Sequence, residues 1–365
     1  MFASLESGAE EPGRYRGGRT AILDQALAVH RQRQGRREVL KDSMQTKPLG
    51  NTGVQLTRIG LGTWAMGGSD WAYSWGPQDD RQSLEAIHRA LDLGINWIDT
   101  AAVYGLGHAE EVVGRALRGM TSRPLIATKC ERCWDASGRI QPCLKRESIL
   151  AEAEASLRRL GVDVIDLYQI HWPQPDEDLE EGWEAIGELI RAGKVRYAGV
   201  SNFNRDQLHR VQQIRPVDSL QPPYSMLMRD IEADVLPYAA EHQMGVVVYS
   251  PMQKGLLTGK VTREWVDQLP ADDHRRGDPQ FQEPQLGANL ALVEGLQAIA
   301  ARHGRSAGEL AIAWVLQRPE VTAALAGARK PSQIEQTARA ADWQLTADEM
   351  AEIEPLLERR QQAGG

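Results

Sequence analysis

Short apolar runs alternate with helical stretches along the chain from Lys47 onward. In the helical stretches, apolar residues recur three and four positions apart, and the runs between them are short and apolar, as in buried strands. The runs that we expect to form strands are Ile59–Thr63, Asn96–Thr100, Leu125–Thr128, Val164–His171, Tyr197–Ser201, Ser219–Gln221, Gly245–Ser250 and Ala323–Ala326. The stretches that we expect to form helices are Asp80–Leu93, His108–Leu117, Arg146–Leu160, Leu179–Arg191, Asn204–Ile214, Ile231–His242, Ser306–Gln317 and Ser332–Ala341.

This strict alternation of strand and helix indicates an α/β protein with a parallel sheet. In a chain of 365 residues, the natural form of such a sheet is a closed (β/α)8 TIM barrel. The alternative, a doubly wound sheet, should carry a glycine-rich phosphate turn after its first strand. Gly105 and Gly107 are the nearest match, but they follow the second strand and lack the third glycine.

Glycines and polar residues mark the ends of several predicted elements. Left-handed C-caps are expected where a glycine follows the last apolar position of a helix, at Gly94, Gly161 and Gly193. N-caps are expected at Asn204 and Ser332.

Three further segments lie outside the eight strand–helix units. Gly53 predicts the turn of an N-terminal hairpin ahead of the first barrel strand. Later in the chain, the polar loop Pro270–Pro284 precedes an extra helix, Gln285–His303, and a final helix runs from about Thr346 to Arg359. Long loops on a barrel usually shape its site.

Residues 1–43 differ from the rest, with few large apolar side chains, eight Lys/Arg and six Asp/Glu. We interpret them as a disordered extension, or as residues ahead of a working start at Met44. A targeting peptide fits less well because of the glutamates. The barrel itself is expected over residues 44–362.

The formal net charge of -8 gives no electrostatic support to nucleic acid or an anionic membrane as partner. There is neither an apolar run of about 18 residues, as a transmembrane helix needs, nor a secretory signal. Three cysteines, Cys130, Cys133 and Cys143, fit a reducing compartment, so we expect a cytoplasmic protein.

Four side chains with complementary chemistry follow consecutive strands, at the barrel end where catalytic groups lie. They are Asp99, Tyr104, Lys129 and His171. A carbonyl that receives hydride needs a proton, which a tyrosine hydroxyl could supply if a nearby ammonium lowered its pKa. Lys129 would serve, Asp99 would hold it, and His171 could donate a hydrogen bond to the substrate oxygen. Alternatively, each alone could be structural, as an ion pair, a packed tyrosine or a core histidine.

The segments around these residues resemble the tetrad motifs of the aldo-keto reductase family. They read Ile-Asp-Thr-Ala-Ala-Val-Tyr-Gly from Ile98, Ala-Thr-Lys from Ala127, and Gln-Ile-His-Trp-Pro from Gln169. The resemblance covers about Lys47 to Leu356, and is close to the bacterial branch carrying Val-Tyr-Gly-x-Gly-His and Gly-Ala-Arg-x-Pro. It implies Tyr104 as general acid, and hydride transfer from a nicotinamide without a metal.

The resemblance also implies a cofactor site. Ser201, Asn202 and Gln221 resemble the groups that bind the nicotinamide carboxamide, which amide side chains suit, and Tyr249 resembles the stacking tyrosine. The other expected contacts are Gly62, Thr63, Trp64, Asp99, Ser250, Pro251, Met252, Gly255, Leu256 and Lys260, where glycines admit a pyrophosphate and Lys260 could neutralise it.

A second anion site is expected where the last barrel strand meets the next helix. Gly327, Arg329 and Gln333 resemble the family's site for the adenosine 2'-phosphate, at a helix N-terminus. That favours NADPH over NADH as cofactor. Gln336 and Thr337 stand where many members have Glu-Asn, so adenine recognition departs from the family pattern.

Other features leave alternatives open. Cys130 and Cys133 could form a metal or redox site, or be ordinary loop cysteines. Four tryptophans could wall the substrate pocket or pack under loops: Trp71, Trp75, Trp134 and Trp172. Rival functions are a Schiff-base aldolase using Lys129 and a non-catalytic cofactor-sensing subunit. The substrate, a small carbonyl compound or sugar, the direction of reaction and the oligomeric state stay open.

Overall fold

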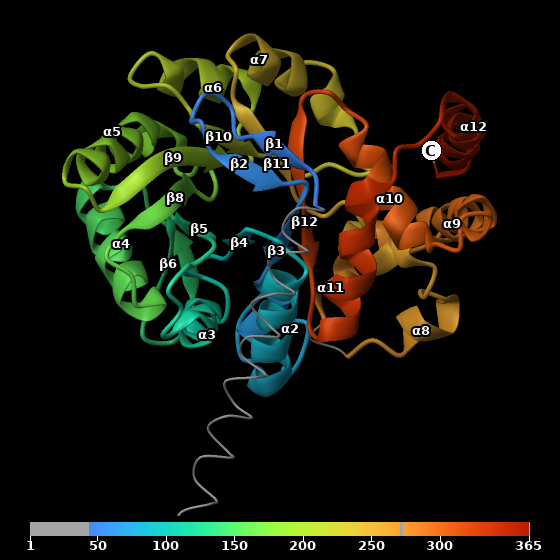
Figure 1. The fold of residues 1–365 in the computed structure, drawn as a ribbon, viewed down its shortest axis with the longest axis horizontal. Coiled ribbons are helices and arrows are strands. Elements are labelled where there is room, and N and C mark those ends of the chain that lie inside the picture. Colours follow the sequence, from blue (N-terminus) through green and yellow to red (C-terminus); the bar gives the residue numbers. More distant parts are fainter. Residues whose placement is uncertain (1–43, 271–272, 365) are drawn as a thin grey trace, which may run out of the picture.

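The computed structural model describes residues 44–270 and 273–364 of the chain, and the predicted extension 1–43 lies outside them. Eight strands form a closed barrel in which each strand is parallel to its two neighbours (Figure 1). In order around the barrel they are β3 (Ile59–Gly62), β4 (Trp97–Asp99), β5 (Leu125–Cys130), β8 (Ile165–Ile170), β9 (Val195–Ser201), β10 (Ser219–Gln221), β11 (Gly245–Val248) and β12 (Val321–Gly327). The predicted (β/α)8 barrel is therefore confirmed.

Helices follow the strands in the predicted alternation and surround the barrel (Figure 1). They are α2 (Asp80–Asp92), α3 (His108–Leu117), α4 (Arg146–Leu160), α5 (Leu179–Arg191), α6 (Arg205–Gln212), α7 (Val235–Glu241), α10 (Ala307–Leu316) and α11 (Pro331–Ala338). Three more helices lie outside this alternation: the short α8 (Arg263–Asp267), α9 (Gln285–Ala301) and α12 (Ala347–Gly364). The long helices α9 and α12 lie side by side beyond α10.

The predicted helix ends are mostly confirmed, with two corrections. Asn204 caps α6, because its side chain accepts a hydrogen bond from the Gln207 amide while the Gln207 side chain accepts one from the Asn204 amide. Ser332 is not an N-cap: proline occupies the first position of α11, so the helix already begins at Pro331. The helix predicted over Ile231–His242 begins only at Val235, after a 3-10 turn.

The loop between β5 and α4 contains a small antiparallel hairpin that the sequence pattern did not predict. Its strands are β6 (Arg132–Trp134) and β7 (Ile140–Pro142). Each is only three residues long and none of its residues is buried, so it has no run of apolar positions to reveal it.

The predicted N-terminal hairpin, β1 (Thr46–Pro48) and β2 (Gln55–Thr57), closes one end of the barrel. Leu49 and Leu56 are almost fully buried and pack with the inward-facing Trp97 at the beginnings of the strands. Space there is tight, since a Cβ added to Gly60 would lie 2.2 Å from the Trp97 ring. The candidate functional site lies at the opposite end of the barrel, where the strands have their carboxyl ends.

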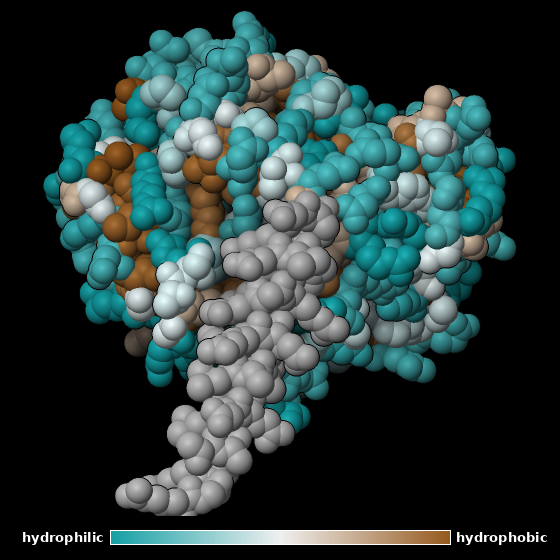
Figure 2. Space-filling model, in the orientation of Figure 1, coloured by the Kyte–Doolittle hydropathy of each residue, from teal (hydrophilic) through white to brown (hydrophobic). Residues whose placement is uncertain are grey.

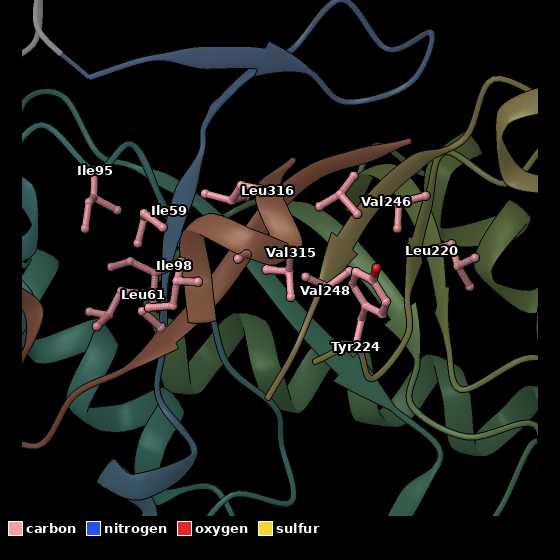
Figure 3. Close-up of a cluster of buried hydrophobic side chains, with 14 of the residues drawn as sticks. Ile59, Leu61, Ile95, Ile98, Leu220, Tyr224, Val246, Val248, Val315 and Leu316 are labelled. Atoms are coloured by element: carbon pink, nitrogen blue, oxygen red, sulfur yellow. The ribbon is translucent and has the colours of Figure 1, made fainter. Parts of the chain in front are cut away.

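The larger core lies between the barrel and its helices. Figure 3 shows Ile59, Leu61 and Ile98 from β3 and β4 with Val315 and Leu316 of α10 in one buried cluster. These strand residues alternate with inward-facing ones, as the period of a strand requires. The strands are thereby fixed by packing, and side chains at their ends are held on a rigid support.

Hydrophilic side chains cover most of the face seen in Figure 2, with hydrophobic ones between them over α4 and α5. Among the described helices, none is both long enough and apolar enough to cross a membrane.

Candidate active site

A buried ion pair lies at the carboxyl ends of β4 and β5. The Lys129 ammonium contacts the Asp99 carboxylate at 2.5 Å and donates to the Thr100 carbonyl oxygen at 2.9 Å. The Lys129 side chain has no exposed surface, and that of Asp99 exposes only 3%. Burial lowers the pKa of Lys129, and Asp99 opposes that shift. Asp99 therefore stabilises a cation that its surroundings disfavour.

The Tyr104 hydroxyl lies 3.4 Å from the Lys129 ammonium nitrogen. Tyr104 follows β4 in a tight turn, and it is buried apart from 7% of its surface. Burial first, and the Asp99 charge second, raise its pKa well above the usual value. The sequence had led us to expect a lowered pKa. The structure has the opposite shift, because desolvation of the phenolate is the largest effect.

His171 directly follows β8 and faces Tyr104 edge-on, with the two ring centroids 5.7 Å apart. Burial lowers the pKa of His171 well below its usual value, and the charges of Lys129 and Arg132 lower it further. At neutral pH the imidazole is therefore neutral. The four residues singled out from consecutive strand ends do converge in space.

Aromatic rings pack against the ring of Tyr104. The Trp64 ring stacks on the Tyr104 ring with centroids 5.8 Å apart, and Trp71 lies 6.1 Å from the same ring. His274 stacks on Trp64 and accepts a hydrogen bond from the Trp75 indole. Trp64, Trp71 and Trp75 thus form an apolar wall beside the Tyr104 ring.

The other two tryptophans considered for this wall have different neighbours. The Arg159 guanidinium lies 5.8 Å from the Trp134 ring centroid, and that of Arg132 lies 5.7 Å from the Trp172 ring centroid. Trp172 exposes 37% of its surface, so it is accessible at the rim.

The residues expected to hold a carboxamide lie beside the ion pair and contact one another. Gln221 donates from its amide nitrogen to the second oxygen of Asp99 at 2.8 Å, and Ser201 donates to the Gln221 carbonyl at 2.7 Å. The Tyr249 hydroxyl donates to the Asn202 amide oxygen at 2.7 Å. Thr63 is also placed here, since its hydroxyl donates to the Asp99 carbonyl oxygen.

The segment after β11 forms irregular turns in which Ser250, Gln253, Lys254 and Gly255 have positive φ. A Cβ at Gly255 would meet no atom within 4 Å, so its backbone faces open space. Leu256 is fully buried, Pro251 is buried and Met252 half-buried, whereas Lys260 is exposed. The Lys254 ammonium contacts Asp278 at 2.7 Å, which ties this segment to the loop that carries His274.

A third group of expected residues surrounds the N-terminus of α11. Gln333 accepts hydrogen bonds from the amides of Arg329 and Lys330, and Thr337 donates to the Gln333 carbonyl. The Arg329 guanidinium donates to the Gln78 side chain at 2.6 Å and to the carbonyl oxygens of Trp75 and Pro77. Arg329 therefore holds the tryptophan-rich loop after β3. Two further expected residues lie nearby in sequence, the exposed Gly327 and the half-buried Gln336.

This arrangement fits a dinucleotide. Amide groups suit a carboxamide and lie next to the tetrad, while an arginine at a helix N-terminus suits a phosphate. The amide groups adjoin Asp99 on β4, and the arginine, Arg329, follows β12. Both β4 and β12 pair with β3, so a ligand that lies over β3 could reach both groups.

Sequence reasoning missed three contributors. Gln169 donates to the Asp99 carboxylate at 3.3 Å, and its place on β8, two residues before His171, could have indicated an inward-facing side chain. Glu131 is fully buried two residues after Lys129. His274 comes from a loop without periodicity, so no pattern could have placed it against Trp64.

The cysteines are free thiols. Burial raises the pKa of Cys130 well above its usual value and that of Cys133 to about 12. Both therefore stay protonated at neutral pH, which does not favour a reactive redox pair. Among the described residues, no three histidine, cysteine, aspartate or glutamate side chains are grouped so that they could hold a metal ion.

The sequence matches the model of the Aldo/keto reductase family over residues 58–358. It is 41% identical over 318 residues to the aldo-keto reductase YhdN of Bacillus subtilis, covering 86% of this chain and 94% of the relative. It is 34% identical over 333 residues to the NADH-specific methylglyoxal reductase of Escherichia coli, covering 87% of this chain and 100% of the relative.

Two solved structures are similar to this chain in fold. A glycerol dehydrogenase from Gluconobacter oxydans superposes with a TM-score of 0.78 at 40% identity, covering 88% of this chain and 96% of that one. An aldo-keto reductase from Bacillus halodurans in its holo form gives a TM-score of 0.71 at 28% identity, covering 86% and 96% of the two chains.

The lowered pKa of His171 gives a prediction about its charge. The imidazole should stay neutral from about pH 8 down to about pH 6, where an ordinary histidine, with a pKa near 6.5, is already mostly protonated. Below about pH 6.5 the unfolded chain then binds one more proton than the folded chain, so the free energy of unfolding falls as the pH falls.

The measurement is an NMR titration of the His171 ring resonances, assigned by their loss in His171→Gln. A flat titration curve in this range is expected, and a midpoint near the usual value would contradict the burial described here.

Proposed function

The chain belongs to the Aldo/keto reductase family and is thus an NAD(P)-dependent oxidoreductase; from that premise we propose that it reduces aldehydes or ketones to alcohols with NADPH, or runs the reverse oxidation. The observation that carries the proposal is the chain of contacts from Asp99 through Lys129 to the Tyr104 hydroxyl, beside the neutral His171.

Tyr104 is the proposed general acid. Its raised pKa keeps the hydroxyl protonated at neutral pH, so the proton is present when a carbonyl arrives. As hydride reaches the carbonyl carbon, the electron pair of the C=O π bond moves to oxygen, and that oxygen takes the proton from Tyr104. The phenolate left behind faces the Lys129 ammonium at 3.4 Å, which stabilises it.

His171 is proposed to orient the substrate. A neutral imidazole has one ring N–H, which can donate a hydrogen bond to the carbonyl oxygen as negative charge develops there. His171 and Tyr104 would then bind the same oxygen from two directions, which fixes the carbonyl carbon toward the cofactor.

Ser201, Asn202 and Gln221 are the proposed partners of the nicotinamide carboxamide, and the Tyr249 ring lies beside them. When bound, the cofactor supplies the hydride. The aromatic wall of Trp64, Trp71 and Trp75 excludes water from the neighbourhood of the Tyr104 ring and offers an apolar surface to the substrate.

The preference for NADPH rests on Arg329. Its guanidinium, half-buried beside the N-terminus of α11, now donates to neutral acceptors in the loop Trp75–Gln78. A 2'-phosphate is a stronger, charged acceptor, and the positive end of the helix dipole adds to its attraction. One relative is named as NADH-specific, so the preference must be measured in this chain.

The aldolase alternative is disfavoured by the surroundings of Lys129. Its side chain has no exposed surface, and its nitrogen contacts Asp99, Thr100 and Tyr104. A substrate carbonyl could reach that nitrogen only if the groups around it moved. A cofactor-sensing subunit would need the same cofactor residues but not the assembled tetrad.

Replacement of Tyr104 by phenylalanine should lower kcat for aldehyde reduction by roughly 10²–10⁴-fold, the usual contribution of a general acid. The hydroxyl is lost while the ring and its contact with Trp64 remain. Cofactor binding, followed by fluorescence quenching, should be unchanged. Retention of wild-type turnover by Tyr104→Phe would falsify the assignment of Tyr104 as acid.

Replacement of Arg329 by leucine should weaken NADPH binding roughly tenfold or more, because a charged hydrogen bond is worth about 1.5–3 kcal/mol. NADH lacks the 2'-phosphate and serves as the internal control, since its dissociation constant should change little. Titration of both cofactors against both proteins gives the four constants needed. Equal losses for NADPH and NADH would mean that Arg329 acts only by holding the loop Trp75–Gln78.

A further inference from the structure

Glu131 occupies an unusual position in the turn that leaves β5, two residues after Lys129. Its side chain is fully buried and its φ is +88°. Only glycine adopts such a φ readily, so this backbone is strained and must be held by its surroundings. The Glu131 amide donates to the Glu152 carboxylate at 3.0 Å, and its carbonyl oxygen accepts from the Cys143 amide at 2.8 Å.

The strained backbone directs the Glu131 carboxyl toward the residue that follows His171. One carboxyl oxygen accepts a hydrogen bond from the Trp172 amide at 3.1 Å and lies 3.4 Å from the Arg132 guanidinium. The other oxygen is buried and has no hydrogen-bond partner. A buried carboxyl that satisfies only part of its capacity is costly, so packing alone does not account for it.

The peptide group between His171 and Trp172 is also held at its carbonyl oxygen. The carbonyl oxygen of His171 accepts a hydrogen bond from the Asn202 side chain at 2.9 Å, and Asn202 also has a positive φ, +64°. The His171 amide in turn donates to the Cys130 carbonyl at 3.2 Å. Glu131 and Asn202, two strained residues on different loops, thus hold the two polar groups of one peptide.

We infer that Glu131 is a positioning residue that, together with Asn202, fixes the His171–Trp172 peptide and so aims the His171 imidazole at the substrate oxygen beside Tyr104. The inference rests on the proposed function, because it gives Glu131 a task in the same reaction. The His171 side chain leaves the backbone at one end of this peptide. A rotation of the peptide therefore moves the imidazole relative to the Tyr104 hydroxyl. Small displacements of groups that contact the reacting atoms strongly lower the reaction rate.

The chemistry of the carboxyl suggests matched variants. Burial, opposed by Arg132 and supported by Glu152, raises the pKa of Glu131 to about 8. At neutral pH a protonated carboxyl still offers an acceptor oxygen to the Trp172 amide. Glu131→Gln keeps that acceptor and the size of the side chain. Glu131→Met removes the acceptor at nearly equal volume, and Glu131→Asp withdraws it by one methylene.

Asp166 offers a control of the same kind. It is a buried carboxylate on β8, the strand that leads to His171, but it binds Arg123 and Arg196 at the other end of the barrel. Asp166→Leu should lower the free energy of unfolding without moving the His171–Trp172 peptide.

The experiment measures the backbone amide resonance of Trp172 by NMR, the dissociation constant of the cofactor, and kcat and KM for aldehyde reduction. In Glu131→Met and Glu131→Asp we expect the Trp172 amide proton to shift upfield and kcat/KM to fall roughly tenfold to a hundredfold. Cofactor affinity should stay unchanged. Glu131→Gln should restore kcat/KM to within about threefold of wild type, and Asp166→Leu should keep it.

The inference fails if Glu131→Met or Glu131→Asp keeps wild-type kcat/KM, if the Trp172 amide does not shift in either, or if Asp166→Leu loses as much activity. It also fails if Glu131→Gln is as impaired as Glu131→Met. Failure of the proposed function is seen separately, as wild-type protein that binds the cofactor but reduces no carbonyl. In that case the amide shift still decides whether Glu131 holds the peptide.

Discussion

The carboxyl end of this barrel is organised around one buried positive charge, the Lys129 ammonium, which requires an opposite charge beside it. Lys129 is withdrawn from water, which disfavours its charge, and the Asp99 carboxylate at 2.5 Å opposes that effect. The second oxygen of Asp99 accepts from Gln169 and Gln221. Four strands, β4, β5, β8 and β10, therefore meet at a single carboxylate. Removal of either charge would leave the other buried without its ion-pair partner.

One end of the barrel contributes mainly to stability, and the other carries the residues with chemical roles. At the end closed by the hairpin, Leu49, Leu56 and Trp97 fill the interior with apolar side chains. At the other end the interior is polar, and the turns after the strands carry Tyr104 and His171. Rigid strands hold the ion pair, and the less regular loops add the aromatic wall. This division keeps the ion pair on a rigid support beneath the loops.

The sequence reveals the parts of this structure that follow from periodicity, and conceals those that depend on contacts between distant loops. Alternation of apolar runs and helices was enough to place the barrel, because the hydrophobic effect acts on every strand and helix alike. Strand ends then placed Asp99, Lys129 and His171. Glu131, His274 and the partners of Arg329 lie in loops that are held by contacts with distant residues, and no repeating pattern records these.

Predictions made from neighbouring residues alone were wrong at two positions. A serine near the beginning of a helix suggested a cap at Ser332, but the preceding proline set the beginning of α11 instead. The expected lowering of the Tyr104 pKa rested on the charge of a neighbour alone. Burial, which no sequence pattern gave for this turn residue, reverses the shift and leaves the tyrosine protonated.

The most direct test of the account is a double-mutant cycle on kcat/KM for cofactor-dependent aldehyde reduction, with Asp99→Asn, Lys129→Met and the two together. If the ion pair acts as one unit that supports Tyr104, the double variant should be about as impaired as the worse single variant. Losses that simply multiply, or a single variant with the wild-type rate, would contradict it.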